Sequence, residues 1–144
     1  MPRIKLNGLQ LYRFRHAVKL QPRDINHAGH LGNDALVSLL GTAQAEMFHS
    51  LGLSQTDLGD GRTGIIMSDM IVNYKSEAFM FDELLIDTHA GEFGRTSFRL
   101  FQRVTRGEAI IALAEKGLTT FDYITRKVAP VPEALLQLLK EASD

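Results

Sequence analysis

Hydrophobic residues recur at two different spacings along the chain, and the longer spacing predicts one helix. Between residues 33 and 52, apolar side chains return every three or four positions, with no proline and few β-branched residues. Few polar positions interrupt them, so we expect a helix of about five turns that is buried on most faces. Asn33 or Asp34 can cap its start, and Gly52 can end it in a left-handed conformation.

The shorter spacing, in which apolar and polar residues alternate, predicts strands. Residues 10–20 form the first such segment, and residues 22–32 are rich in turn-forming residues, so we expect a loop there. Four more strands are expected after the helix, at residues 65–74, 83–90, 96–104 and 109–123. Leucines at residues 133–141 predict a short amphipathic helix at the end of the chain.

These elements predict a particular α+β architecture. A mostly apolar helix must be covered, and five antiparallel strands offer one apolar face to cover it. We therefore expect an antiparallel five-stranded sheet wrapped around one long central helix, with a short C-terminal helix, in a single domain over residues 1–144. Such a sheet leaves an open edge, which pairing between subunits would close, so we expect a homo-oligomer.

Composition narrows the possible functions. A net charge of −1 provides no field to hold a phosphate backbone, so nucleic-acid binding is not expected. The chain has no cysteine, which excludes disulfides and thiolate nucleophiles and fits a cytoplasmic location. No signal peptide and no membrane-spanning apolar run are evident, so we expect a soluble protein. The spacing of His27, His30 and His49 forms no clear metal set, and no metal is expected.

One segment before the helix resembles a known family signature. Residues 23–33 read Arg-Asp-Ile-Asn-His-Ala-Gly-His-Leu-Gly-Asn. They resemble the signature Asp-x-Asp-x-x-Gly-His-Val-x-Asn of hotdog thioesterases of the 4-hydroxybenzoyl-CoA thioesterase type. Similar strings follow at residues 43–52, 71–74, 82–84, 94–98 and 125–132. The resemblance covers nearly the whole chain.

This resemblance implies a fold, an activity and an assembly. The fold is the hotdog fold, and the activity is hydrolysis of an acyl thioester of coenzyme A or acyl carrier protein to a free acid and a thiol. The assembly is a homodimer or a homotetramer built from dimers. No separate cofactor is implied, since coenzyme A or phosphopantetheine belongs to the substrate.

This chain departs from the family signature at one position: where the family usually has its catalytic carboxylate, this chain has Asn26. An amide can neither attack a carbonyl nor take a proton at neutral pH. The resemblance therefore assigns water activation to Asp24, His30 or Glu46, with Asn26 orienting the water or the thioester. Thr42 stands where the family often has a glutamate on the helix.

Substrate-binding residues follow from the same resemblance. The N–H groups at the helix start, near Gly32 and Asn33, can polarise the thioester carbonyl. The acyl group would lie between the helix and the second strand, near Thr42, and a neighbouring subunit would supply the other wall with residues Ile66, Met67, Ser68 and Asp69. Cationic side chains can bind the phosphates of coenzyme A or phosphopantetheine. The candidates are Arg95, Arg103, Arg106, Arg126 and Lys127, of which Arg95 and Arg126 are assigned to the site.

Each candidate also has a purely structural explanation. Asp24 can close a turn after Pro22, and His30 can pack where the loop meets the helix. Asn33 can serve only as a helix cap. Glu46 can emerge at the solvent edge of the helix, whereas a carboxylate facing a pocket without a partner would be costly and would suggest function.

Two other functions stay open on the sequence. A non-hydrolytic acyl-binding or assembly module on the same fold would account for Asn26 at the carboxylate position. An enoyl-thioester hydratase would need an aspartate and a histidine spaced to add water, and Asp24 and His30 match that requirement in part.

Overall fold

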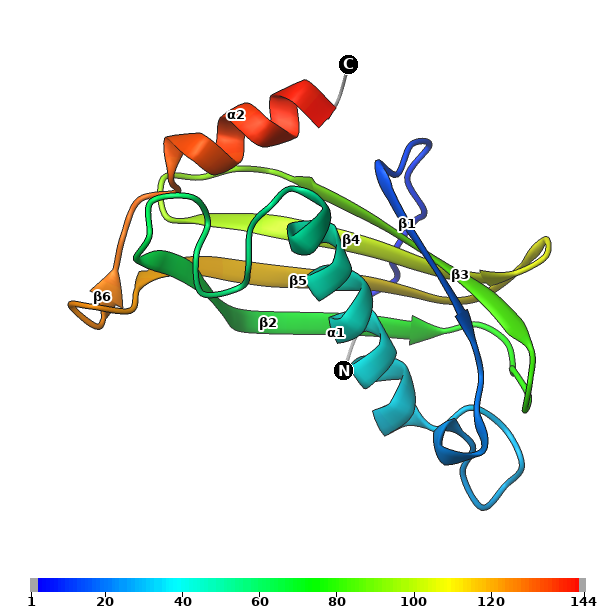
Figure 1. Ribbon diagram of the computed structural model, residues 1–144. Helices are drawn as coiled ribbons and strands as arrows, with labels where there is room; N and C mark the ends of the chain where they lie inside the picture. The colour runs from blue at the N-terminus through cyan, green and yellow to red at the C-terminus, as the bar shows by residue number, and fades with distance from the viewer. Residues whose placement is uncertain (1–2, 143–144) are drawn as a thin grey trace.

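The computed structural model describes residues 3–142 and has the α+β architecture expected from the sequence (Figure 1). Its helices are the short 3-10 helix η1 (Pro22–Asp24), α1 (Asn33–Ser50) and α2 (Glu133–Ala142). Its strands are β1 (Phe14–Lys19), β2 (Thr63–Tyr74), β3 (Glu83–Gly91), β4 (Ser97–Arg106), β5 (Ala109–Asp122) and the two-residue β6 (Lys127–Val128).

All strand pairs are antiparallel, in the order β1-β3-β4-β5-β2, and β6 pairs only with the end of β5. The long helix α1 crosses one face of this sheet, and α2 lies at one end of it (Figure 1). This is the hotdog arrangement. Because β2 ends the sheet, one side of its backbone has no strand partner within the described chain.

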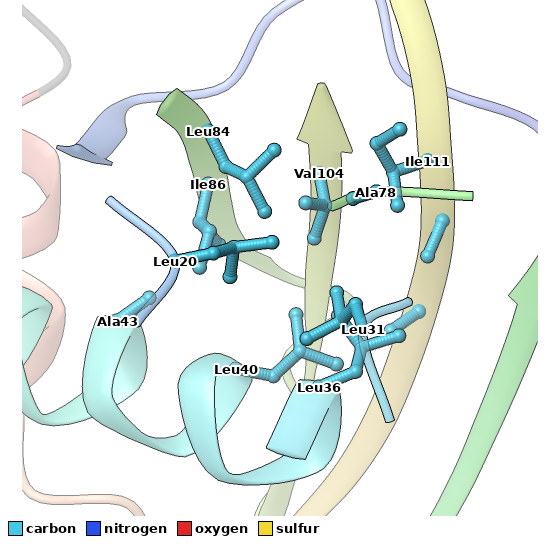
Figure 2. Packing of buried hydrophobic residues seen from close by; sticks show 12 residues of the cluster. Leu20, Leu31, Leu36, Leu40, Ala43, Ala78, Leu84, Ile86, Val104 and Ile111 are labelled. Carbon is cyan, nitrogen blue, oxygen red and sulfur yellow. The ribbon is translucent and has the colours of Figure 1, made fainter. Parts of the chain in front are cut away.

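The apolar positions of α1 hold it against the sheet, as the helical spacing predicts. Leu36, Leu40 and Ala43 are buried against Ile86 of β3 and Val104 of β4 (Figure 2). Further along the helix, a second buried cluster combines residues of α1, β4, β5 and α2, namely Met47, Phe48, Phe98, Leu100, Leu118 and Leu135. Burying such side chains contributes about 1.5–3 kcal/mol each, which explains why α1 stays on the sheet.

The start of α1 differs from the sequence prediction. Neither Asn33 nor Asp34 caps the helix; the capping residue is Gly32, which makes no side-chain cap hydrogen bond. The Gly32 N–H donates to the carbonyl of Asp24 at 3.0 Å, and the Gly32 carbonyl accepts from Leu36 N at 2.9 Å. The preceding loop therefore joins the helix through backbone bonds. The end of the helix agrees with expectation, since Gly52 has a φ of +75°.

The first strand is shorter than predicted, because it begins at Phe14 rather than at residue 10. The residues before it bond to side chains of the sheet instead: Leu6 N donates to Asn73 Oδ1 at 2.6 Å. The guanidinium of Arg103 also lies 4.5 Å from the ring centre of Tyr12. Gln102 bonds to the α1 carbonyl of Leu40, so its neighbour Arg103 points to the other face of the sheet. The N-terminal segment therefore contacts the face that α1 leaves open.

Candidate functional site

The loop before α1 is held together by hydrogen bonds of its own side chains. Asp24 Oδ2 accepts from Gln21 N at 2.8 Å, which closes the η1 turn. Asn26 Oδ1 accepts from Ala28 N at 3.0 Å, and Asn26 N donates to the His30 carbonyl at 2.9 Å. Both side chains thus shape the loop that presents His30 to the start of α1.

A pocket of about 270 Å³ opens where this loop meets α1. We call it the helix-start pocket, and it is lined by His30, Leu31, Asn33, Leu36, Ile111 and residues 74–78. The intrahelical hydrogen bonds begin with Leu36 N, so the N–H groups of Asn33, Asp34 and Ala35 precede them. Together these groups carry roughly half a positive charge, which can polarise a carbonyl oxygen placed in the pocket.

His30 is the ionisable group best placed to move a proton in this pocket. Its Nδ1 lies 3.1 Å from the Leu31 carbonyl, so the tautomer with a proton on Nδ1 donates to that oxygen. In this tautomer Nε2 has a free lone pair and can accept a proton. Nε2 also lies 3.9 Å from Glu77 Oε1, which can stabilise the imidazolium once it forms.

Glu77 and Lys75 line the helix-start pocket but were not among the residues singled out in the sequence. They belong to a short polar stretch, Lys75-Ser76-Glu77, between β2 and β3. The sequence marks this stretch only as a break between strands. Its position beside His30 comes from the sheet order, which places the end of β2 near the start of α1.

Glu46 and Thr42 lie farther along α1, outside the helix-start pocket. Glu46 is exposed and, at a rise of about 1.5 Å per residue, lies about 20 Å along the axis from Asn33. Thr42 is also exposed, and its hydroxyl donates to the Ser38 carbonyl at 3.2 Å. Within one subunit the structure therefore does not bring Glu46 together with Asp24 and His30.

The four candidates on β2 surround a bulge between Met67 and Asp69. Ile66 and Met67 are exposed, and Ser68 donates from Oγ to the Gly117 carbonyl at 3.0 Å. Asp69 receives two hydrogen bonds from Arg99, each 2.8 Å long, and these bonds hold the pKa of the Asp69 carboxyl below its usual value. All four belong to an edge strand and lie away from His30 in the same chain.

Arg95 and Arg126 lie near β6 and the start of α2. The Arg95 carbonyl accepts from Val131 N at 2.8 Å, and the Arg126 guanidinium lies 5.3 Å from the ring centre of Phe121 and 5.5 Å from that of Tyr123. This end of the sheet is opposite to the start of α1 (Figure 1). One subunit alone therefore does not place these arginines at the helix-start pocket.

A second hollow, of about 380 Å³, lies between the middle of α1 and β2. We call it the α1–β2 groove; its lining includes Val37, Gly41, Gln44, Ile65, Met67, Met70 and Lys116. Lys116 is 3% exposed, and burial lowers its pKa to about 8. Lys116 is the one lysine in the apolar segment at residues 109–123, but the sequence does not show which face of the strand it occupies.

The profile of the thioesterase-like superfamily matches residues 20–139. The chain belongs to this superfamily. The match begins just before the loop that carries Asp24 and His30 and ends in α2, so it includes the helix-start pocket and the α1–β2 groove. A search of curated protein sequences found no match.

Solved structures share the fold of this superfamily member at low sequence identity. A 1,4-dihydroxy-2-naphthoyl-CoA thioesterase from Synechocystis superposes with a TM-score of 0.80 at 16% identity, covering 91% of this chain and 98% of that one. A thioesterase from Thermus thermophilus, solved with coenzyme A and zinc, superposes with a TM-score of 0.79 at 23% identity, covering 93% and 96%. A Staphylococcus aureus protein in complex with coenzyme A gives 0.81 at 15% identity, covering 94% and 87%.

Superfamily membership supports thioester hydrolysis as the general class of chemistry for this chain. Among residues 3–142, no helix is both long and apolar enough to span a bilayer. Within the same residues, no three histidine, cysteine, aspartate or glutamate side chains are grouped so that they could hold a metal ion.

Proposed function

We propose that this protein hydrolyses an acyl thioester of coenzyme A or acyl carrier protein in the helix-start pocket. The observation that carries the proposal is that His30 and Asn33, the first of the α1 residues whose N–H groups precede the intrahelical hydrogen bonds, line the same hollow. Thioester hydrolysis needs these two functions together, because one polarises the carbonyl and the other activates water.

In the proposed reaction the thioester carbonyl oxygen accepts hydrogen bonds from the N–H groups at the start of α1. His30 Nε2 takes a proton from a water molecule, whose oxygen attacks the carbonyl carbon. The carbon–sulfur bond then breaks, and the thiolate leaves with the proton from His30, so the products are a free acid and a thiol. Asp24 and Asn26 position the loop, and Glu77 stabilises the protonated imidazole.

We propose further that the active unit is a homodimer joined through β2, with a homotetramer made of two such dimers as the larger alternative. The strand has 12 residues and, among residues 3–142, pairs with β5 alone; Ile66 and Met67 on it are exposed. A twofold axis pairs two such strands antiparallel, so the first residues of one lie beside the last residues of the other. Ile66, Met67, Ser68 and Asp69 of the second subunit would then form a wall of the site.

The same symmetry brings the far end of the second subunit toward the helix-start pocket. Arg95 and Arg126 belong to that end: Arg126 N donates to the carbonyl of Asp122, which pairs with Thr63 at the start of β2, and the Arg95 carbonyl accepts from Val131 N. In the proposed dimer they would bind the phosphates of coenzyme A or phosphopantetheine through charge-assisted hydrogen bonds. This accounts for the distance between these arginines and the helix-start pocket within one chain.

Replacing His30 tests the proposed chemistry. With acyl-CoA substrates, His30→Gln should lower kcat by about 10²–10⁴-fold, since it removes the general base. The measurement is release of free thiol over a panel of straight-chain and aromatic acyl-CoA thioesters. His27→Gln is a matched control, because His27 is exposed in the same loop. A kcat for His30→Gln equal to that of the wild type would contradict the mechanism.

Asn26 favours one alternative, an acyl-thioester-binding module without catalysis. Its side chain bonds within the loop and supplies no carboxylate. The same panel separates the two functions. Turnover no faster than in buffer for every thioester, together with measurable binding of acyl-CoA by calorimetry, would establish the binding module instead.

A further inference from the structure

Lys116 is a buried cation at the base of the α1–β2 groove. It lies in the middle of β5, where its backbone pairs with Met70 of β2 and with Leu100 of β4. Its Nζ donates to Gln44 Oε1 of α1 at 2.9 Å, and Gln44 Nε2 in turn donates to Gln55 Oε1. Polar atoms of three separate segments therefore meet beneath the helix.

Within the part of the chain that the structure describes, no counter-charge balances Lys116. An ammonium group has three N–H donors, and the hydrogen bond to Gln44 uses one of them on a neutral acceptor. Among the residues that the structure describes, no carboxylate forms an ion pair with Lys116. With a pKa of about 8 the side chain is still mainly protonated at neutral pH. A buried charge without a counter-ion is costly, so this site favours an anion.

Of the described residues, Lys116 is the one charged residue that lines the groove; the other polar side chains of the lining are those of Gln44, Gln55, Thr56 and Tyr123, and the rest of the walls is apolar. Val37 comes from α1, and Ile65, Met67 and Met70 come from β2. Along α1 and β2, the groove lies next to the helix-start pocket. The pocket touches Asn33 and Tyr74, whereas the groove touches later residues of α1 and earlier residues of β2.

We propose that this groove holds the acyl chain of the substrate and that Lys116 binds a carboxylate at its far end. The inference rests on the proposed function and names its substrate class, which is thioesters of dicarboxylic acids. Methylene groups of the chain would contact Val37, Met67 and Met70. The distal carboxylate would accept a charge-assisted hydrogen bond from Nζ, stronger than the bond to a neutral amide.

The position of Lys116 also sets the length of the chain. Gln44, which contacts Lys116, lies about 16 Å along the axis of α1 from Asn33 at the helical rise of about 1.5 Å per residue. A medium or long chain spans such a distance, and a succinyl or malonyl group does not. The site therefore selects a long dicarboxylic acyl group over a short one.

Binding of non-hydrolysable thioether analogues of acyl-CoA tests this inference without relying on turnover. Two analogues are compared by calorimetry: they have the same chain length, and one ends in a carboxylate while the other ends in a methyl group. We expect the wild type to bind the carboxylate analogue about tenfold or more tightly, because a buried charge pair forms. Equal affinities in the wild type would overturn the inference.

Substituting the lysine assigns the preference to this site. In Lys116→Met the affinity ratio should fall to about one or below, and Lys116→Gln is a second, shorter neutral variant should the first fail to fold. Lys140→Met, on the exposed face of α2, should keep the wild-type ratio. A ratio unchanged in both Lys116 variants would refute the role of this side chain.

The outcome also separates this inference from the proposed function. A wild-type protein that prefers the carboxylate analogue but hydrolyses no thioester would support the role of Lys116 and contradict the proposed hydrolysis. A protein that hydrolyses acyl-CoA yet binds both analogues equally would support the proposed hydrolysis and contradict the role of Lys116.

Discussion

Asp87 and Lys116 are both buried in the sheet, and their surroundings differ in charge. Asp87 accepts from Arg15 Nε at 2.7 Å and from Arg103 Nη2 at 3.1 Å. Burial opposes ionisation of Asp87, but these two hydrogen bonds outweigh it and hold the pKa of the carboxyl below its usual value. Lys116 has only the neutral Gln44 amide beside its ammonium among the hydrogen bonds of residues 3–142. The contrast marks Lys116 as a site for an external anion.

The pKa of Lys116 has a consequence for stability that can be measured. Burial lowers it to about 8 from an ordinary value of 10.5, so between these two pH values the unfolded chain binds more protons than the folded chain. The stability of the wild type therefore rises with pH across that window, relative to a variant without the lysine, and this gain is lost as pH falls through about 8.

We predict that Lys116→Met is more stable than the wild type at pH 7, by up to about 3 kcal/mol at ~1.4 kcal/mol per pKa unit. The advantage should shrink as pH rises from 8 to 10. Urea denaturation of both proteins at pH 7 and pH 10 measures it. In Lys140→Met, where the lysine is exposed, the difference from wild type should not depend on pH in this way. A constant advantage for Lys116→Met at both pH values would contradict the assigned burial effect.

At the scale of elements, α1 is held mainly by apolar packing rather than by its ends. Gly32 contributes no side-chain cap, whereas Leu40 and Phe48 are fully buried. The Leu40 carbonyl also accepts a hydrogen bond from Gln102 Nε2 at 2.9 Å, which ties the middle of α1 to β4. The position of the helix start, and with it the helix-start pocket, therefore depends on packing far from that pocket.

Leu40→Ala should lower the free energy of unfolding by about 2–5 kcal/mol, because it removes buried methyl groups and leaves a cavity. Denaturation with urea at neutral pH measures the change. Ser38→Ala, two residues away on the exposed side of the same helix, should change stability by less than about 0.5 kcal/mol. Equal effects of the two substitutions would show that α1 does not depend on this contact.

The elements also show which local predictions were reliable. The helix and the strands after it follow from periodicity, since residues 33–52 and 65–74 were expected and Asn33–Ser50 and Thr63–Tyr74 are found. The ends of these elements differ from the prediction by about two residues, since α1 ends at Ser50 and β2 begins at Thr63. The cap at Asn33 was wrong because the backbone of Gly32 is already bonded to Asp24 and Leu36, a contact between segments that periodicity does not report.

For the whole molecule, β1 and β2 form the two edges of the described sheet, and β2 is the longer, with 12 residues against 6. An unpaired strand edge invites pairing with another chain, and a lysine on such an edge discourages it. Ile66 is 42% exposed on this strand. The proposed dimer would bury it, so this position is suited to testing the assembly.

Ile66→Lys should convert the dimer to a monomer and reduce hydrolysis with it, because the second subunit would no longer complete the site. Size-exclusion chromatography with light scattering measures the mass, and thiol release measures activity on the same sample. Ile110→Lys is the control, since Ile110 is similarly exposed at 40% but lies at the β4–β5 hairpin. A wild type that is monomeric and active would contradict the proposed assembly.

The candidate site combines residues whose sequence separation is large. His30 and Asn33 were visible in the sequence because they belong to one signature segment. Glu77 and Lys116 were missed, because a single charged residue in a turn or a strand carries no pattern of its own. They join the site through the order of the strands, which places β2 and β5 beneath α1.

The sequence by itself determined the elements and their order, because the burial of a helix or a strand repeats with a period that the residues record directly. The tertiary structure decided which face of the sheet each side chain occupies and which distant segments meet. A shift of one residue in the pairing of β5 would move Lys116 to the opposite face. That register is set by packing across the whole sheet, so the cation beneath α1 becomes apparent only in three dimensions.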